Sequence, residues 1–374
     1  MVDALRGFAV AAILLVHSLE HFIYNRFPVI ASPEWASFNQ AWKDAFFFLF
    51  AGKSYTIFAL LFGFTYAVQL KNCRKKGGDF SGRFAWRMLL LALFASVNAV
   101  FFPGGDILLT FAFAGLVMIP FRHAGTSVLV TAALFFLLQP LEWGYAAYGW
   151  MHPGWEPPHV LGEWMYPALE PAIDRGSFWA MAWANLTTGQ AASFSWGMDA
   201  GRLMQAPGLF LAGFLLGRDD YFSSTKPGND AFWVRVLLVS LAGAFIFYAA
   251  QAVFVTPGPV KTILTMWHNV CFSGIWVAGF ALLYRAVCFR KVTAALNCYG
   301  KMSLSNYVGQ SIAGSLVFFP YGLGLASSCG YVASFAIGVM LMVLQILFCR
   351  RWLATHRYGP LEGLWRHATW WRLR

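Results

Sequence analysis

The chain alternates long apolar stretches with short polar breaks, and this pattern predicts a bundle of membrane-spanning helices. A helix of about 20 mostly apolar residues crosses the hydrocarbon core of a bilayer. Ten such segments are expected, at approximately 5–24, 45–69, 84–102, 107–121, 125–140, 203–217, 232–254, 267–289, 304–320 and 331–349. We therefore expect a single all-α domain over residues 1–374, a polytopic membrane helix bundle of about ten transmembrane helices.

Composition supports the same class of protein. Of the 374 residues, 59% are hydrophobic and only 11% are charged, and the mean hydropathy is +0.58. Soluble domains average about 45–50% apolar and about 25% charged residues, so a soluble enzyme is excluded. The six cysteines include no C-x-x-C pair, so we expect neither a disulfide framework nor a bound metal.

The net charge of +11 is distributed in a way that indicates topology rather than nucleic-acid binding. Alternate breaks hold 17 of the 27 Lys and Arg residues, whereas the opposite breaks hold five: Arg26, Lys43, Arg175, Arg202 and Lys261. Membrane proteins retain basic loops in the cytoplasm. We expect a multi-pass protein of the bacterial inner membrane with both termini cytoplasmic, membrane lipids as partners and no nucleic acid.

Two segments depart from the spanning pattern. Residues from about 141 to 202 form a Trp-rich extracytoplasmic insertion, which is either an aromatic belt at the headgroups or a lid over an external substrate site. Its residues 177–192 are expected to form a helix in the outer interface. Residues from about 350 to 374 are basic and Trp-rich, and they are predicted to form an amphipathic cytoplasmic tail.

The first apolar segment contains four ionisable residues, and ionisable residues inside a membrane span usually mark function. At 100° per residue, Arg6, His17, Glu20 and His21 share one helical face, with His17 about 16 Å along the axis from Arg6. His17 is a candidate general base and Glu20 a group that orients it. Arg6 is a candidate for binding a donor's phosphates, and His21 for binding substrate.

Ordinary explanations compete with these roles. Arg6 and His21 could extend towards the two headgroup layers, which would account for them without any chemistry. The residues His17 to His21 also match the H-x-x-E-H pattern of some zinc proteases, which is a weak signal without an obvious third ligand.

Four polar residues in other spans complete the set of candidates for substrate or donor binding: Lys53, Asp106, Asn306 and Gln310. Lys53 needs an anionic partner or must extend to the headgroups. Asp106 follows two glycines and is also suited to cap a helix. Asn306 and Gln310 lie on one face, where hydrogen bonding between helices is the simpler explanation.

The start of the chain resembles acyltransferase family 3 membrane proteins. The shared residues are Asp3, Leu5, Arg6 and Gly7, followed by His17 eleven positions after Arg6. In that family the Arg-x10-His pair is tied to transfer of acyl groups from a cytoplasmic donor to extracytoplasmic sugars. The resemblance covers the first span alone.

A second resemblance, to the YeiB-like bacterial family (domain of unknown function 418), runs nearly end to end. The residues that carry it begin with Asp3 to Gly7, then 52–53, 60–64, 105–108, Gly213 and 217–218, and end with 300–307, 310–311, 321–325, 358–362 and 365–366. This family is commonly placed in a superfamily of transmembrane acyltransferases. The resemblance therefore implies a membrane bundle with a link to acyl transfer.

Together these observations lead us to expect acyl transfer from a cytoplasmic acyl-CoA-type donor to an extracytoplasmic glycan or lipid-linked hydroxyl, with no permanently bound cofactor. A transporter or channel that uses the buried charged stripe as a proton or substrate relay is the main alternative. A non-catalytic partner of another membrane enzyme is the third hypothesis. Assembly into a homo-oligomer is left open.

Overall fold

The computed structural model describes residues 1–75, 80–103, 107–155, 165–223, 228–254 and 258–370, which are helical with no strand among them. The helices of the amino-terminal half are α1 (Val2–Leu19), α2 (Pro33–Phe50), α3 (Lys53–Arg74), α4 (Ser81–Ala99), α5 (Leu108–Met118), α6 (Thr126–Leu137) and α7 (Pro140–Met151). Those of the carboxy-terminal half are α12 (Arg202–Arg218), α13 (Asn229–Val253), α14 (Pro259–Leu283), α15 (Val287–Val292), α16 (Ala294–Lys301), α17 (Ser303–Phe318), α18 (Tyr331–Thr355) and α19 (Pro360–Trp370). The prediction of an all-α bundle is confirmed.

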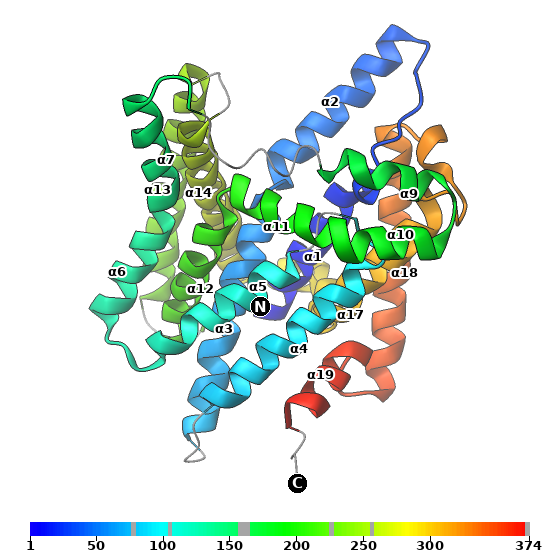
Figure 1. Ribbon diagram of the computed structural model, residues 1–374. Coiled ribbons are helices and arrows are strands. Elements are labelled where there is room, and N and C mark those ends of the chain that lie inside the picture. The colour runs from blue at the N-terminus through cyan, green and yellow to red at the C-terminus, as the bar shows by residue number, and fades with distance from the viewer. Residues whose placement is uncertain (76–79, 104–106, 156–164, 224–227, 255–257, 371–374) are drawn as a thin grey trace.

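Between the two halves, residues 165–199 form short helices that lie across the bundle. They are η4 (Pro167–Leu169), α9 (Glu170–Asp174), α10 (Phe178–Ala184), a π-helical turn (Asn185–Gly189) and α11 (Gln190–Asp199). In Figure 1 the green ribbons α9, α10 and α11 cross the upper part of the molecule in front of α1, whereas α2 stands out at the top and α19 lies at the bottom. The insertion therefore covers one end of the bundle.

The helix boundaries follow most of the predicted spans but depart from several of them. The predicted eighth span, 267–289, corresponds to α14, which begins at Pro259 and ends at Leu283. The predicted second span, 45–69, is interrupted, because Ala51 and Gly52 separate α2 from α3 and Gly52 has a left-handed backbone (φ 75°). The predicted first span, 5–24, ends earlier, since α1 stops at Leu19 and His21, Phe22 and Ile23 all have positive φ. Glu20 and His21 therefore do not continue the helical face on which the sequence placed them.

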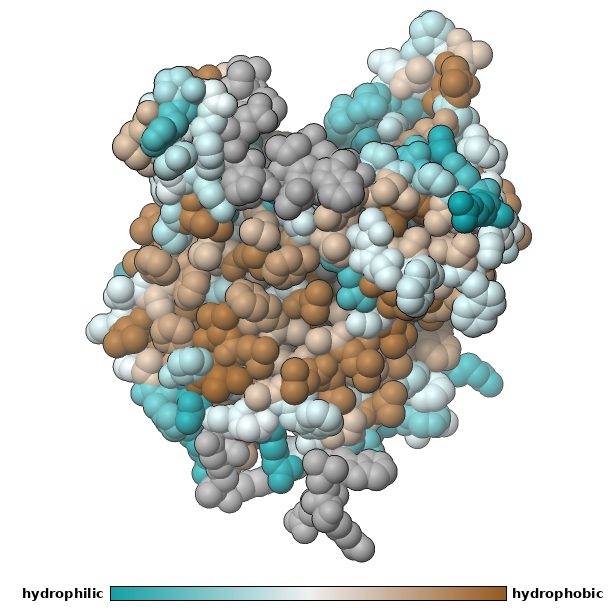
Figure 2. Space-filling model, in the orientation of Figure 1, coloured by the Kyte–Doolittle hydropathy of each residue, from teal (hydrophilic) through white to brown (hydrophobic). Residues whose placement is uncertain are grey.

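Among the described residues, five helices are long and apolar enough to cross a membrane, with Pro33–Arg74 (α2 and α3) counted as one. A sixth span arises if α6 and α7, bent by 43°, are counted together. Other predicted spans, such as α5 and α17, are formed by shorter helices. Figure 2 shows a belt of hydrophobic residues across the middle of the molecule, with hydrophilic residues above and below it. The length of the helices and this belt together indicate a membrane protein.

Glycine lets two pairs of helices approach each other at the backbone. A Cβ atom on Gly300 of α16 would lie 1.8 Å from the Asp3 carbonyl oxygen of α1, and one on Gly213 of α12 would lie 1.8 Å from the Leu60 carbonyl oxygen of α3. Small residues at helix interfaces are typical of membrane bundles, where close packing replaces the hydrophobic effect. These contacts fix α1 and α12, the two helices that carry the site described below.

Candidate functional site

A cavity of about 520 Å³ lies beneath the insertion, at the end of α1. Its walls come from α1, the α2–α3 break, the start of α12 and residues 166–196 of the insertion. Most of the lining is apolar or aromatic, and a few polar side chains converge on it, among them His17, Glu20 and Arg202. This combination, in this range of volumes, is typical of a small-molecule site.

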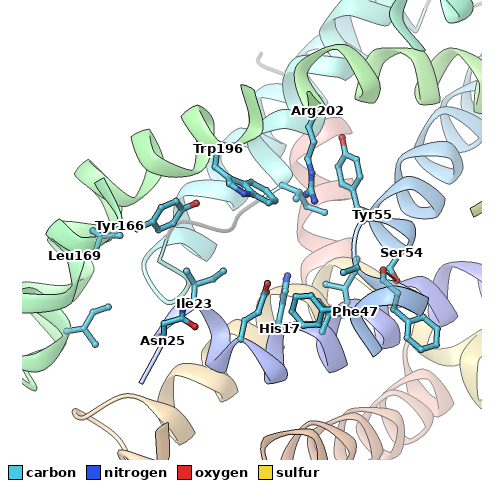
Figure 3. Close-up of a pocket in the computed structure, with 18 of the residues that line it drawn as sticks. His17, Ile23, Asn25, Phe47, Ser54, Tyr55, Tyr166, Leu169, Trp196 and Arg202 are labelled. Carbon is cyan, nitrogen blue, oxygen red and sulfur yellow. Dashed lines mark hydrogen bonds between the residues drawn. The ribbon is translucent and has the colours of Figure 1, made fainter. Parts of the chain in front are cut away.

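His17 is half-buried in the last turn of α1 and points into the cavity (Figure 3). Its ring lies 4.7 Å from the ring of Phe102 and 6.1 Å from that of Phe22, between centroids. Its buried Nδ1 atom has no hydrogen-bond partner among the described residues. The ring is thus supported by aromatic packing on one side while its edge faces open space.

Glu20 follows the last residue of α1 and also lines the cavity. The next three residues, His21 to Ile23, form a turn with φ values of 44°, 55° and 72°. Left-handed backbone costs a non-glycine residue roughly 1–2 kcal/mol, and a run of three such residues is unusual. This left-handed turn reverses the chain, so that Ile23 and Asn25 also line the cavity.

Arg202, the first residue of α12, enters the cavity from the side opposite His17 (Figure 3). Its guanidinium lies over two rings, 4.4 Å from the centroid of Tyr55 and 4.1 Å from that of Trp196. Such cation–π contacts hold the cation in place without neutralising it. The charges of Arg202 and Glu20 interact across the cavity.

The insertion supplies one wall of the cavity through Tyr166, Leu169, Glu170, Ile173 and Trp196. Burial raises the pKa of the Tyr166 hydroxyl, and the positive charge of Arg202 only partly opposes this effect. Tyr166 is therefore protonated at neutral pH and can donate a hydrogen bond to a ligand. This part of the insertion lines the cavity, and the role of the insertion as aromatic belt or lid stays a prediction.

An ionic clamp joins the insertion to the chain that follows the left-handed turn. The guanidinium of Arg26 lies 2.7 Å from Asp174 and 3.2 Å from Glu170, and the Tyr24 hydroxyl donates to Asp174 at 2.5 Å. Asp174 ends α9, one of the helices over the cavity. The clamp of Tyr24, Arg26, Glu170 and Asp174 therefore connects both rims of the cavity.

Weakening this clamp should loosen α9. We expect Asp174→Asn to increase the rate of tryptic cleavage after the exposed Arg175, because the substitution removes the charge that holds both Arg26 and Tyr24. Cleavage of the detergent-solubilised protein is followed by mass spectrometry. Glu34→Gln removes an exposed carboxylate from the start of α2 that takes no part in the clamp, and it serves as control. Equal cleavage rates in the two variants would show that the clamp does not restrain the insertion.

Two predicted site residues are sequence neighbours of residues that line the cavity, but they do not line it themselves. His21 is fully buried, with Nε2 2.6 Å from the Ser334 hydroxyl and its ring stacked between Phe27 and Phe318. Lys53 is directed towards α2 and α14, where its ammonium lies 5.6 Å from the Phe48 ring and 5.5 Å from the Phe272 ring. Their predicted roles in binding gain no support from these positions.

Asn306 and Gln310 are also separate from the cavity. The Asn306 side chain donates to the Tyr299 carbonyl oxygen at 2.9 Å and contacts the Cys349 sulfur, which favours hydrogen bonding between helices. Gln310 is fully buried, and its two polar side-chain atoms have no partner among the described residues. Asp106 lies outside the described residues.

Arg6 lies near the opposite end of α1 from His17. Its guanidinium pairs with Asp3 at 2.8 Å and donates to the Thr65 hydroxyl at 2.9 Å. It lines a second, smaller pocket rather than the cavity. The structure thus brings together His17 and Glu20 of the predicted set and adds Arg202, which the sequence analysis named only among the basic residues of the external breaks.

The comparisons with known proteins support the resemblance to the YeiB-like family. Residues 216–372 match the family model described as "Protein of unknown function (DUF418)". The uncharacterised protein YxaH of Bacillus subtilis is 26% identical over 99% of this chain and 93% of its own length. The uncharacterised protein YeiB of Escherichia coli is 24% identical over 98% of this chain and 95% of its own.

No solved structure matches the chain, and the likeness of the first helix to acyltransferase family 3 stays a prediction. The relatives align over nearly the whole chain. The match over residues 216–372 adds the carboxy-terminal half, from the end of α12 to α19. These findings confirm the predicted resemblance to the YeiB-like family, and residues 216–372 are similar to the DUF418 family model.

Proposed function

We propose that the protein is a membrane-embedded acyltransferase that acylates a hydroxyl of a glycan or lipid-linked acceptor bound in the cavity. The observation that carries this proposal is the convergence of His17, Glu20 and Arg202, from two different helices, on one ligand-sized space. The distribution of basic residues supports an orientation with the insertion outside and the opposite end of the bundle in the cytoplasm.

In the proposed reaction the neutral imidazole of His17 takes the proton of the acceptor hydroxyl while its oxygen attacks the carbonyl carbon of an acyl thioester. Arg202 faces the oxyanion of the tetrahedral intermediate, and the ionised Glu20 stabilises the imidazolium. The carbon–sulfur bond then breaks, and the leaving thiolate takes the proton from the imidazolium. The products are an acyl ester and a free thiol, and His17 returns to its initial state.

Reconstitution tests this proposal against the transport alternative. Proteoliposomes that contain the protein and a membrane extract as acceptor receive radiolabelled acetyl-CoA on the side of the basic loops. If the protein transfers acyl groups, label remains in covalently modified acceptor after free acetyl-CoA and acetate have been extracted with solvent. Movement of label across the membrane without a covalent product would instead establish transport and overturn the proposal.

Arg202 provides a further prediction for the same assay. Arg202→Gln should lower the initial rate at saturating donor by about 10²-fold, the usual effect of removing an oxyanion-stabilising donor. Arg175→Gln removes a charge from the same side of the molecule outside the cavity and should leave the rate unchanged. A rate for Arg202→Gln equal to that of this control would exclude Arg202 from the reaction.

A further inference from the structure

A second pocket, of about 150 Å³, lies between α1, α3, α4, α17 and α19. We call it the inner pocket, since it lies towards the end of the bundle where α3 ends and α19 begins. Arg6, Arg87 and Lys301 line it, together with one carboxylate, Glu362. The inner pocket is thus a cationic site on the side of the bundle away from the insertion.

The carboxylate of Glu362 is already hydrogen-bonded within the protein. Its oxygens accept hydrogen bonds from the backbone N–H of Leu304 at 2.7 Å, from that of Ser305 at 3.1 Å and from the Ser305 hydroxyl at 2.5 Å. It therefore caps the amino terminus of α17 and neutralises that helix end. Little of its charge is available to balance the cations of the inner pocket.

Two of the three cations have no carboxylate partner among the described residues. Arg6 is paired with Asp3. Arg87 is half-buried and lies over the Trp365 ring, 3.6 Å from its centroid, with the charge of Arg366 nearby. Lys301 is exposed at the rim. Arginine and lysine gathered in this way are suited to binding a phosphate group.

The deeper part of the inner pocket is apolar. Gln69 lines it near the cations, and Phe58 lines it eleven residues earlier on the same helix, about 16 Å away along the axis. Phe62, Leu91 and Leu108 complete this part. The shape therefore suits a chain with a charged head rather than a free inorganic ion.

The apolar end of the inner pocket approaches the outer cavity. Tyr55 lines the cavity and Phe58, one turn further along α3, lines the inner pocket; likewise Ile107 lines the cavity and Leu108 lines the inner pocket. Between them stands the fully buried Phe111, whose ring lies 5.6 Å from Tyr55 and 5.7 Å from Phe58. About one aromatic side chain separates the two spaces.

We infer that the inner pocket is the donor site, where Arg87 and Lys301 hold the phosphate of a phosphate-bearing acyl donor while its acyl arm runs between α3 and α4 towards Phe111 and the cavity. This inference rests on the proposed acyl transfer and adds where the donor is held. A soluble coenzyme A thioester, which would leave as the thiol, and a phospholipid of the adjoining leaflet, which would leave as the lysolipid alcohol, both carry a phosphate and a linked acyl chain.

Binding measurements on the purified full-length protein test the inference without any turnover. Isothermal titration with acetyl-CoA covers the soluble donor, and native mass spectrometry covers phospholipid retained through purification. Arg87→Gln and Lys301→Gln should each weaken binding of the relevant ligand about tenfold. Arg83→Gln is the matched control, because Arg83 lies one turn earlier on α4 and over a Trp ring in the same way, 4.3 Å from the Trp370 centroid, but does not line the pocket.

The outcomes separate this inference from the proposed function. The donor site is supported if ligand binding is weakened in Arg87→Gln but unchanged in Arg83→Gln and in His17→Ala. This holds for acetyl-CoA and for a phospholipid, and it holds even if no acyl transfer is found. Failure of the wild-type protein to bind either ligand, or binding that Arg87→Gln and Lys301→Gln leave intact, overturns the donor site. In that case acyl transfer by the wild-type protein would still uphold the proposed function.

Discussion

Replacing His17 with alanine is expected to reduce the rate of acyl transfer at least 100-fold. A positioned general base typically contributes about 10²–10⁴-fold to a rate, and His17 is the histidine that lines the cavity. The change also removes a ring that packs on Phe102, so folding must be measured beside activity. The rate is taken as incorporation of label from acetyl-CoA in proteoliposomes, and folding from thermal unfolding in detergent.

His268→Ala is the matched control. His268 is a buried histidine of α14 that lies beside the rings of Phe48 and Phe272, away from the cavity. Its loss should cost a similar amount of stability and leave the rate per folded molecule unchanged. Equal rates for the two variants would remove His17 from the mechanism, and the cavity would then have to be read as a binding site alone.

The largest effect on stability is expected from Gly300→Ala and Gly213→Ala. In each case the added methyl group would lie 1.8 Å from a backbone oxygen of the neighbouring helix, so whole helices must move apart. Overpacking a core typically costs about 1–3 kcal/mol, and a rigid backbone contact belongs at the upper end or beyond it. We expect a large fall in the midpoint of thermal unfolding, or loss of folded protein on expression.

Gly279→Ala provides the comparison within the same chain. Gly279 lies inside α14, and a methyl group there would meet nothing within 4 Å. Alanine should therefore be neutral or stabilising by about 0.5–1 kcal/mol, since glycine is disfavoured in a helix. If Gly213→Ala and Gly300→Ala behave like Gly279→Ala, the close approach of α3 to α12 and of α1 to α16 is wrong.

Much of the helical framework could be predicted because apolar length alone dictates it. The predicted spans at 84–102 and 232–254, for example, correspond to α4 and α13 within a few residues. Apolar patterning does not fix which helices cross the membrane, since α5, inside a predicted span, has only 11 residues. The break at Gly52 was also missed, because a glycine inside an apolar run looks the same whether its φ is helical or left-handed.

The site was predicted only as far as a single helix could reveal it. His17 follows from its place on α1, and Glu20 was predicted from the same run of ionisable residues although it lies past the end of the helix. Arg202 belongs to the cavity only because α12 packs beside α3. A usable signal did exist, since Arg202 is one of the few basic residues in the breaks predicted to be external. By contrast, the direction in which the Lys53 side chain points depends on contacts with Phe48 and Phe272, and no local sequence pattern encodes these contacts.

The left-handed turn at residues 21–23 has a consequence for how the acid at the end of α1 is kept in place. A conformation that costs several kcal/mol persists only when neighbours outweigh it. Here those neighbours belong to α17 and α18: Phe318 beneath the His21 ring, Ser334 at its Nε2 atom, and Gly314, whose missing side chain makes room for Phe22. Part of the free energy that positions Glu20 is thus supplied by two helices that contribute no side chain to the cavity. Substitutions in α17 or α18 can therefore change the position of Glu20 while every residue that lines the cavity stays the same.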